Sequence, residues 1–197
     1  MRVKDRFLEK INLLIFTLSL CLSHSLYAEN IYKKVLNYNN ELKNSVANFI
    51  QTNDNYIQEG EIFFGGSRIK IVYLKPKKIT VILSEKKGVY INHQLKESNF
   101  FATKNSYIKF FFDMFYNKKY LESLTLINSQ DKIELIEKKE LDNVLYNIKL
   151  VYENEPIKLR RLEIIDGSVK TQMGFFNHRF EQNLDKKFFS MTDPYLN

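Results

Sequence analysis

Short runs of alternating apolar and polar residues fill most of the sequence after residue 45, and they limit the fold more than any other feature. The clearest run is NVLYNIKLVY. Every second side chain of an extended strand points to the same side of a sheet, so this run has one apolar face. That face comprises Val144, Tyr146, Ile148, Leu150 and Tyr152. We expect about 10 or 11 such strands joined by tight turns, which predicts an antiparallel sheet curled into a barrel or half-barrel.

Similar runs occur in the first half of the chain. RIKIVYLKP places Ile69, Ile71 and Tyr73 on one face, and this strand ends at its proline. KITVILSEKKGVYINHQL follows as a strand, a turn and a second strand. In the second half, Asp166-Gly167 is a strong hairpin signal. No linker or internal repeat divides these strands, so we expect one domain.

Two segments have the spacing of helices instead. In NIYKKVLNYNNELKN, residues 30–44, apolar residues recur at i, i+4, i+7 and i+11, which is one face of a helix. They are Ile31, Val35, Tyr38 and Leu42. The second segment, YIKFFFDMFYNKKYL, covers residues 107–121 and interrupts the strands in the middle of the chain.

The helix expected over 107–121 is rich in phenylalanine. One side of it carries a stripe of large apolar side chains: Ile108, Phe111, Phe112 and Phe115, flanked by Phe110 and Met114. Burying one phenylalanine side chain stabilises a fold by roughly 1.5–3 kcal/mol, so such a stripe must be covered. The pattern fits an ordinary core helix. It fits equally a movable plug over a lipid cavity, in which the methionine adapts its shape.

The first 28 residues have the features of a secretory signal peptide. Basic residues precede an apolar stretch over 11–22, and SHSLYA ends at Ala28, where we expect cleavage. The stretch is shorter than the roughly 18 apolar residues that a membrane span needs. The expected mature domain, 29–197, contains no cysteine, so it depends on its packed core rather than on disulfides. This favours the periplasm of a Gram-negative cell.

The mature domain is basic. It holds 26 Lys and Arg residues against 21 Asp and Glu, a net charge of +5. Nucleic acid is a poor partner for an exported domain, and we expect none. Attraction to anionic lipid headgroups or to an acidic protein is one explanation of the charge. A generally lysine-rich proteome is the other.

Motifs that carry catalytic chemistry are missing from the sequence. The mature domain has two histidines, His93 and His178, each isolated, and no HExxH pair that would hold zinc. It has no Gly-x-Ser-x-Gly elbow and no thiol nucleophile. The adjacent glycines Gly65 and Gly66 fit a hairpin turn better than a phosphate loop. We therefore expect a binding protein without a metal or cofactor, and not an enzyme.

The order of these segments resembles the LolA family of periplasmic lipoprotein carriers over essentially the whole mature chain. The matching pieces are Phe49-x-Gln51, Glu59-Gly60, Tyr73-x-x-Pro76, Ser84 to Tyr90, Asp166-Gly167, and Phe188 with Pro194. The resemblance implies a mainly β fold. It would be a strongly curved, incomplete antiparallel β-barrel of about 10 or 11 strands, with helices packed as a lid over the concave side.

The resemblance also implies a function. Members of the family take acylated lipoproteins from an ABC-type release complex in the inner membrane, shield the acyl chains, and deliver them to an acceptor at the outer membrane. This implies a monomeric periplasmic carrier with no cofactor and no covalent step. Two alternatives stay open. One is a lipid- or lipoprotein-sensing module of the same fold, and the other is an envelope assembly protein that uses the sheet only for protein contacts.

A site for acyl chains follows from the same resemblance. The residues expected to line the cavity or its lid are Ile31, Val35, Tyr38, Leu42, Ile69, Ile71, Tyr73, Val81, Leu83, Ile108, Phe111, Phe112, Met114 and Phe115. Many members carry an Arg-Pro pair whose arginine hydrogen-bonds the lid. Here GGS occupies that place, with Gly65 at the position of the arginine. Arg68, three residues on, is the candidate replacement for this latch.

Overall fold

The computed structural model describes residues 30–53, 56–104, 106–141, 143–167 and 169–196. The predicted signal peptide, 1–28, lies outside the described residues. The chain divides into two units, residues 1–35 and residues 36–197. What is described of the first unit, 30–35, is helical, and this helix runs to residue 41. Among the described residues, no helix combines the length and the apolar character needed to cross a bilayer.

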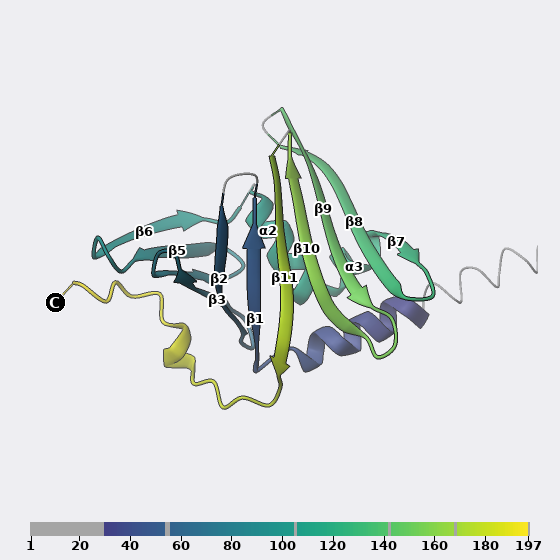
Figure 1. Cartoon of the computed structure of the whole chain (residues 1–197), viewed down its shortest axis with the longest axis horizontal. Coiled ribbons are helices and arrows are strands. Elements are labelled where there is room, and N and C mark those ends of the chain that lie inside the picture. The colour runs from purple at the N-terminus through teal and green to yellow at the C-terminus, as the bar shows by residue number, and fades with distance from the viewer. Residues whose placement is uncertain (1–29, 54–55, 105, 142, 168, 197) are drawn as a thin grey trace, which may run out of the picture. The chain divides into compact units, whose positions relative to one another are not determined.

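The second unit is built on one antiparallel sheet, which has eleven strands within the described residues (Figure 1). The strands are β1 (Ser45–Thr52), β2 (Ile57–Phe64), β3 (Ile69–Lys75), β4 (Ile79–Leu83), β5 (Lys87–Asn92), β6 (Glu97–Ala102), β7 (Thr125–Asn128), β8 (Lys132–Leu141), β9 (Val144–Glu153), β10 (Lys158–Asp166) and β11 (Val169–Arg179). Their order in the sheet is β6-β5-β4-β3-β2-β1-β11-β10-β9-β8-β7. The sheet is not closed, because β6 and β7 form its two free edges. This confirms the predicted incomplete barrel.

Local sequence explains the strands and their turns. The predicted apolar face of β9 lies on the buried side, where Ile148, Leu150 and Tyr152 are fully covered. The hairpin predicted at Asp166-Gly167 joins β10 to β11, with Asp166 opposite Val169. Gly167 has a φ of 56°, a backbone conformation that glycine adopts without strain.

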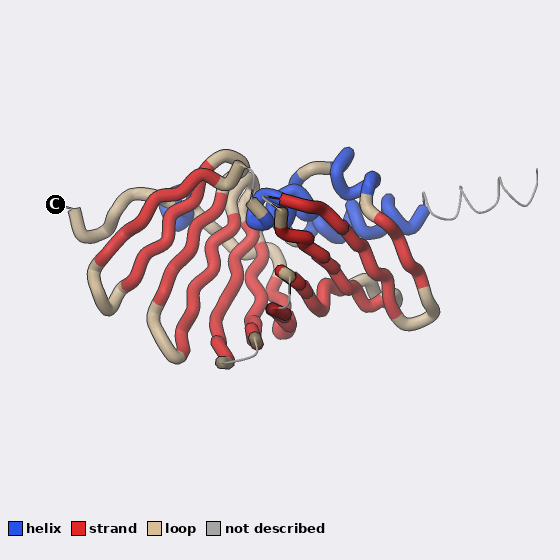
Figure 2. Tube along the Cα trace, turned by 90° about the horizontal axis from the view of Figure 1, so that it is seen from above, coloured by secondary structure: helices blue, strands red, loops and turns tan. Residues whose placement is uncertain are grey.

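Helices interrupt the strands after β6. They are α2 (Tyr107–Tyr116) and α3 (Lys118–Ser123), and a short 3₁₀ helix, η1 (Lys186–Phe189), follows the last strand. In Figure 1, α2 and α3 pass behind the strands of the second half of the sheet, and Figure 2 shows the curvature of the strands from above. The helices thus cover one face of the sheet, as the fold class predicted.

The chain after β11 covers part of the opposite, outer face. We name residues 182–196 the C-terminal strap. The ring of Phe188 packs edge-on against Phe63, with 4.8 Å between centroids, and Lys70 Nζ lies 3.8 Å from the Phe188 centroid. Farther along, Met191 and Tyr195 pack on a small cluster of outward side chains: Ile82, Val89 and Ile91. Strands β2 to β5 therefore have packed side chains on both faces.

Candidate ligand cavity

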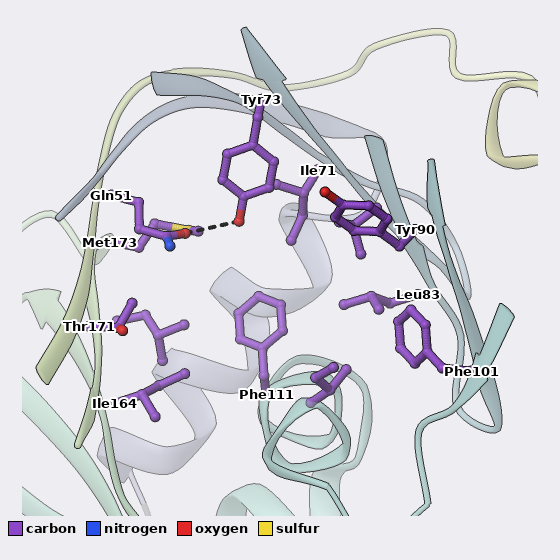
Figure 3. Close-up of a pocket in the computed structure, with 13 residues that line it drawn as sticks. Gln51, Ile71, Tyr73, Leu83, Tyr90, Phe101, Phe111, Ile164, Thr171 and Met173 are labelled. Atoms are coloured by element: carbon purple, nitrogen blue, oxygen red, sulfur yellow. Dashed lines mark hydrogen bonds between the residues drawn. The ribbon is translucent and has the colours of Figure 1, made fainter. Parts of the chain in front are cut away.

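A cavity of about 420 Å³ lies between the concave face of the sheet and α2 (Figure 3). Strands from both halves of the sheet line it, together with the first half of the helix. The lining residues are Gln51, Ile71, Tyr73, Val81, Leu83, Tyr90, Phe101, Ile108, Phe111, Leu162, Ile164, Thr171 and Met173. The volume falls in the range of roughly 300–1,000 Å³ that is typical of small-molecule sites.

The lining of the cavity is mainly apolar, and no charged residue belongs to it among the residues that the structure describes. Its polar groups are Gln51, Thr171 and the two tyrosine hydroxyls. The Tyr73 hydroxyl donates to Gln51 Oε1 at 2.9 Å, and Gln51 Nε2 donates to Gln58 Oε1 at 3.3 Å. A charged ligand group would lose its hydration here without gaining an ionic partner. The cavity therefore favours an apolar ligand.

Two glycines make room for aromatic rings in the cavity wall. A Cβ at Gly60 would lie 2.8 Å from the ring of Phe49, which in turn packs edge-on against the ring of Tyr73 at 5.2 Å. Gly88 pairs with Phe101 across β5 and β6, and a Cβ there would collide with that ring. Glycine at these two positions thus lets Tyr73 and Phe101 take their places in the wall.

Helix α2 contributes Ile108 and Phe111 to the cavity. Figure 3 shows the Phe111 ring standing between the wall formed by Leu83 and Phe101 and the wall formed by Ile164 and Thr171. The two helix residues are three positions apart and belong to one side of the first turns of α2. These turns close one side of the cavity.

The other aromatic side chains of α2 pack elsewhere, so the predicted single stripe is divided. Phe115 contacts Phe64 of the sheet, with ring centroids 5.1 Å apart. Phe112 stacks on Tyr116 at 4.5 Å, and Phe110 stacks on the Tyr120 ring of α3 at 6.3 Å. All these phenylalanines are buried. The second half of α2 and Phe110 therefore belong to the core, whereas Ile108 and Phe111 form a cavity wall.

Two sets of hydrogen bonds hold the second half of α2. Asn39 Nδ2 donates to the carbonyl oxygen of Met114 at 3.1 Å, and the Tyr152 hydroxyl donates to Asn39 Oδ1 at 3.1 Å. The Tyr116 hydroxyl donates to the carbonyl oxygens of Gly65 and Arg68, at 2.8 and 3.1 Å. Burial raises the pKa of the Tyr116 hydroxyl, so it keeps its proton and remains a donor.

Six of the residues predicted for the site do line the cavity: Ile71, Tyr73, Val81, Leu83, Ile108 and Phe111. Six others are buried outside its lining: Tyr38, Leu42, Ile69, Phe112, Met114 and Phe115. Ile31 and Val35 belong to the first unit of the chain and do not line the cavity. The sequence periodicity predicted the apolar faces correctly. Several of their residues, however, pack against other side chains and do not border the cavity.

The latch predicted for Arg68 takes a different form. The guanidinium donates from Nη1 to the carbonyl oxygen of Phe189 at 2.6 Å, so it holds the C-terminal strap. Its main-chain oxygen, together with that of Gly65, receives the Tyr116 hydroxyl of the helix. The same turn therefore contacts the strap through a side chain and α2 through its backbone.

Seven lining residues were missed by the sequence reasoning: Gln51, Tyr90, Phe101, Leu162, Ile164, Thr171 and Met173. Five of them are in phase with the apolar or buried face of their own strand, but Tyr90 alternates with the outward Val89 and Ile91, and the strand of Phe101 has no clear alternation. That alternation names a buried face, but it does not say whether the face meets the cavity. The four residues from β10 and β11, and Gln51 near the end of β1, come together only because β1 pairs with β11.

Within the described part of the chain, no group of three or more His, Cys, Asp or Glu side chains gathers as a metal site would. No known family model matches the sequence. No curated protein matches it either.

Solved structures do resemble the chain. An uncharacterised conserved protein from Thermus thermophilus is 9% identical, with a TM-score of 0.55, over 86% of this chain and 96% of that one. The MucA/MucB complex of Pseudomonas aeruginosa gives 10% identity and a TM-score of 0.47 over 83% of this chain and 60% of that one. A domain from Vibrio parahaemolyticus assigned to outer membrane lipoprotein sorting gives 9% and 0.47, over 82% of this chain and 97% of that one. The likeness to the Thermus protein shows that the two chains share a fold.

Proposed function

We propose that this protein is a periplasmic carrier that binds the acyl chains of lipoproteins in the cavity between the sheet and α2. The observation that carries the proposal is the uncharged, mainly apolar lining of that cavity, enclosed by a sheet that remains unclosed. The resemblance of the sequence to the LolA carriers points to the same cargo. The proposal includes that the protein catalyses no reaction and uses no cofactor.

Acyl chains need such a site if they are to cross an aqueous compartment. Each buried methylene is worth about 0.8 kcal/mol, so a chain exposed to water strongly prefers a membrane or an aggregate. A carrier must offer comparable burial and must also give the chain up. An open-edged sheet with one wall made by a single helix suits this need, because the wall can move without breaking the ladder of strand hydrogen bonds.

Helix α2 is the element that would move. Its second half is fixed by the Asn39 and Tyr116 hydrogen bonds, while Ile108 and Phe111 at its start border the cavity. We infer that these two side chains fill space in the empty protein and turn aside when an acyl chain enters. The two side chains and the acyl chain then compete for one apolar site. This competition lowers the affinity of the protein for the acyl chain and allows its release to a partner.

The partners in this proposal are acylated lipoproteins, an inner-membrane release complex of the ABC type that loads the carrier, and an outer-membrane acceptor. A sensing module of the same fold would bind the same chains but would not hand them on. Transfer of bound cargo to an acceptor membrane therefore separates the two functions.

The proposal is tested by gentle purification from the cell envelope followed by mass spectrometry of bound lipid and lipoprotein. Ile164→Glu places a carboxylate in the cavity and should abolish the bound material. Ile165→Glu is the matched control, since its side chain points to the opposite face of β10, and it should retain cargo. If the two variants carry equal cargo, or the wild-type protein carries none, the proposal is wrong.

A further inference from the structure

Two neighbouring turns at one end of the sheet present exposed leucines. The turn between β3 and β4, taken together with the last two residues of β3, covers residues 74–78, and the turn between β5 and β6, taken together with the first residue of β6, covers 93–97. They lie at the same end because Tyr73 pairs with Ile79 and Ile79 pairs with Asn92. Figure 2 shows successive turns along the free ends of these strands. We name these two turns the hairpin edge.

Leucine side chains stand out from the hairpin edge into solvent. Leu74 is 48% exposed and Leu95 is 63% exposed. Leu196 reaches 77% exposure, and its neighbour Tyr195 is fixed here by a 2.8 Å hydrogen bond with His93 Nδ1. A single exposed leucine needs no explanation, but three from distant parts of the chain at one place indicate a surface that something apolar covers.

Lysines accompany these leucines. The two turns contain Lys75, Lys77, Lys78 and Lys96, all exposed, and one acidic residue, Glu97. Lys75 also pairs with Glu59 of the neighbouring strand at 3.6 Å. Lysine beside a protruding apolar side chain suits a bilayer surface, because the ammonium remains among the headgroups while the leucine enters the acyl layer.

The opposite end of the same strands shows the contrast. The turn between β4 and β5, taken together with the first residue of β5, covers residues 84–87 and contains the exposed Lys86 and Lys87 but no large apolar residue. The turn between β2 and β3 is occupied by its contacts with Tyr116 and Phe189. Apolar protrusion combined with positive charge is thus a property of the hairpin edge and not of every turn.

We propose that the hairpin edge docks on the surface of a bilayer that contains anionic lipids, with Leu74, Leu95 and Leu196 entering the boundary between headgroups and acyl chains. Tyr73, a cavity residue, directly precedes Leu74, so docking brings the cavity wall next to the membrane. The inference rests on these exposed leucines and lysines and not on the cavity. Vesicle binding can therefore succeed or fail independently of the cargo proposal.

The sequence contains no tryptophan, so Leu95→Trp introduces a unique fluorescent reporter. With vesicles of phosphatidylglycerol and phosphatidylethanolamine, its emission should shift to the blue, and brominated acyl chains should quench it. With phosphatidylcholine vesicles the effect should be weaker. Ile127→Trp is the control, since Ile127 is exposed on β7 at the far edge of the sheet, and its emission should not move.

Charge is tested in the same assay. In the Leu95→Trp background, Lys77→Gln and Lys78→Gln should each weaken binding to the anionic vesicles about fivefold. Lys86→Gln and Lys87→Gln, at the opposite end of the strands, should leave it unchanged. Residues 1–28 are the same in every variant, so any binding of that basic segment to the vesicles affects all variants equally. An unshifted Leu95→Trp spectrum, an equal shift in Ile127→Trp, or equal losses in both lysine pairs would overturn the inference and leave this edge to a protein partner.

Discussion

Val81→Phe would fill part of the cavity with a larger side chain. It should therefore weaken ligand binding while leaving the fold stable. Val81 lies on β4 between Ile71 of β3 and Tyr90 of β5, and all three side chains line the cavity. Phenylalanine is larger than valine by about four carbon atoms, each comparable to one methylene of an acyl chain. Its ring would occupy space that we assign to the cargo.

The expected loss follows from the displaced methylenes. Four of them at about 0.8 kcal/mol each amount to about 3 kcal/mol, which weakens acyl binding on the order of a hundredfold. Stability should change far less. Adding a ring to a well-packed core costs roughly 1–3 kcal/mol, but here the ring enters a cavity of about 420 Å³ and needs little rearrangement.

Binding is measured by titrating a fluorescent diacylated lipopeptide, and stability by thermal unfolding. Val72→Phe is the control: this residue is one position from Ile71 on β3, opposite Thr80, and faces the outer side of the sheet. It should leave binding unchanged. If Val81→Phe binds the lipopeptide as tightly as the wild type, or if Val72→Phe loses as much affinity, acyl chains do not occupy this cavity.

Three further perturbations test the framework around the site. Asn39→Leu leaves a buried hydroxyl and a buried carbonyl without their partner, so it should lower the free energy of unfolding by roughly 1–3 kcal/mol, whereas the exposed Asn40→Leu should have little effect in denaturant titrations. Gly60→Ala should strongly lower the melting temperature because its Cβ would lie 2.1 Å from the main-chain oxygen of Val72 and 2.8 Å from the Phe49 ring, and Gly66→Ala, with open space around it, should not. Burial and two nearby cations lower the pKa of His178 to about 4 from its usual 6.5, so the unfolded chain takes up this proton first as the pH falls. Stability should therefore drop from pH 6.5 to pH 4, and melting curves of His178→Gln should show a smaller drop; an equal drop in both proteins would contradict this.

The strands could be predicted from the sequence because their signals are local. Alternation over a few residues fixes which side chains share a face, and Asp166-Gly167 fixes a turn without reference to the rest of the chain. The same reasoning placed Ile71 and Tyr73 on the concave side, where the structure has them. Local signals thus gave the sheet, its approximate strand number and one wall of the cavity.

The opposite wall could not be predicted in this way. Leu162 and Met173 belong to β10 and β11, and they face the cavity because β1 pairs with β11, which is distant in sequence. Nothing in either strand records that pairing. For the same reason the strap was not foreseen: Phe188 reads as part of a short apolar pair, and only the folded sheet shows that it covers Phe63 and Lys70.

The helix 107–116 shows how far a helical pattern can mislead. An apolar stripe identifies what must be buried, but the side chains of this helix are buried on several of its sides. Phe112 and Phe115 satisfy that need against Tyr116 and Phe64, so they are unavailable to a ligand. Ile108 and Phe111, three positions apart on one side of the helix, border the cavity instead. The core-helix interpretation therefore holds for Phe112 and Phe115, whereas the plug remains a proposal for Ile108 and Phe111.

The latch gives the reason why residue identity is a poor guide to such contacts. The sequence has GGS where an arginine would hold the lid, and this suggests that the contact is lost or moved to Arg68. In the structure the donor and acceptor roles are exchanged: the hydroxyl of Tyr116 on the helix donates, and main-chain carbonyls of the turn accept. Every residue has a main-chain carbonyl, so the sequence of the turn does not reveal which residues accept this hydrogen bond. The small residues of the turn still matter, because a Cβ at Gly65 would lie 2.8 Å from the Phe189 ring of the strap that the Arg68 side chain holds. Losing an arginine at this place thus allows a close approach of the strap, while the helix remains held by the backbone.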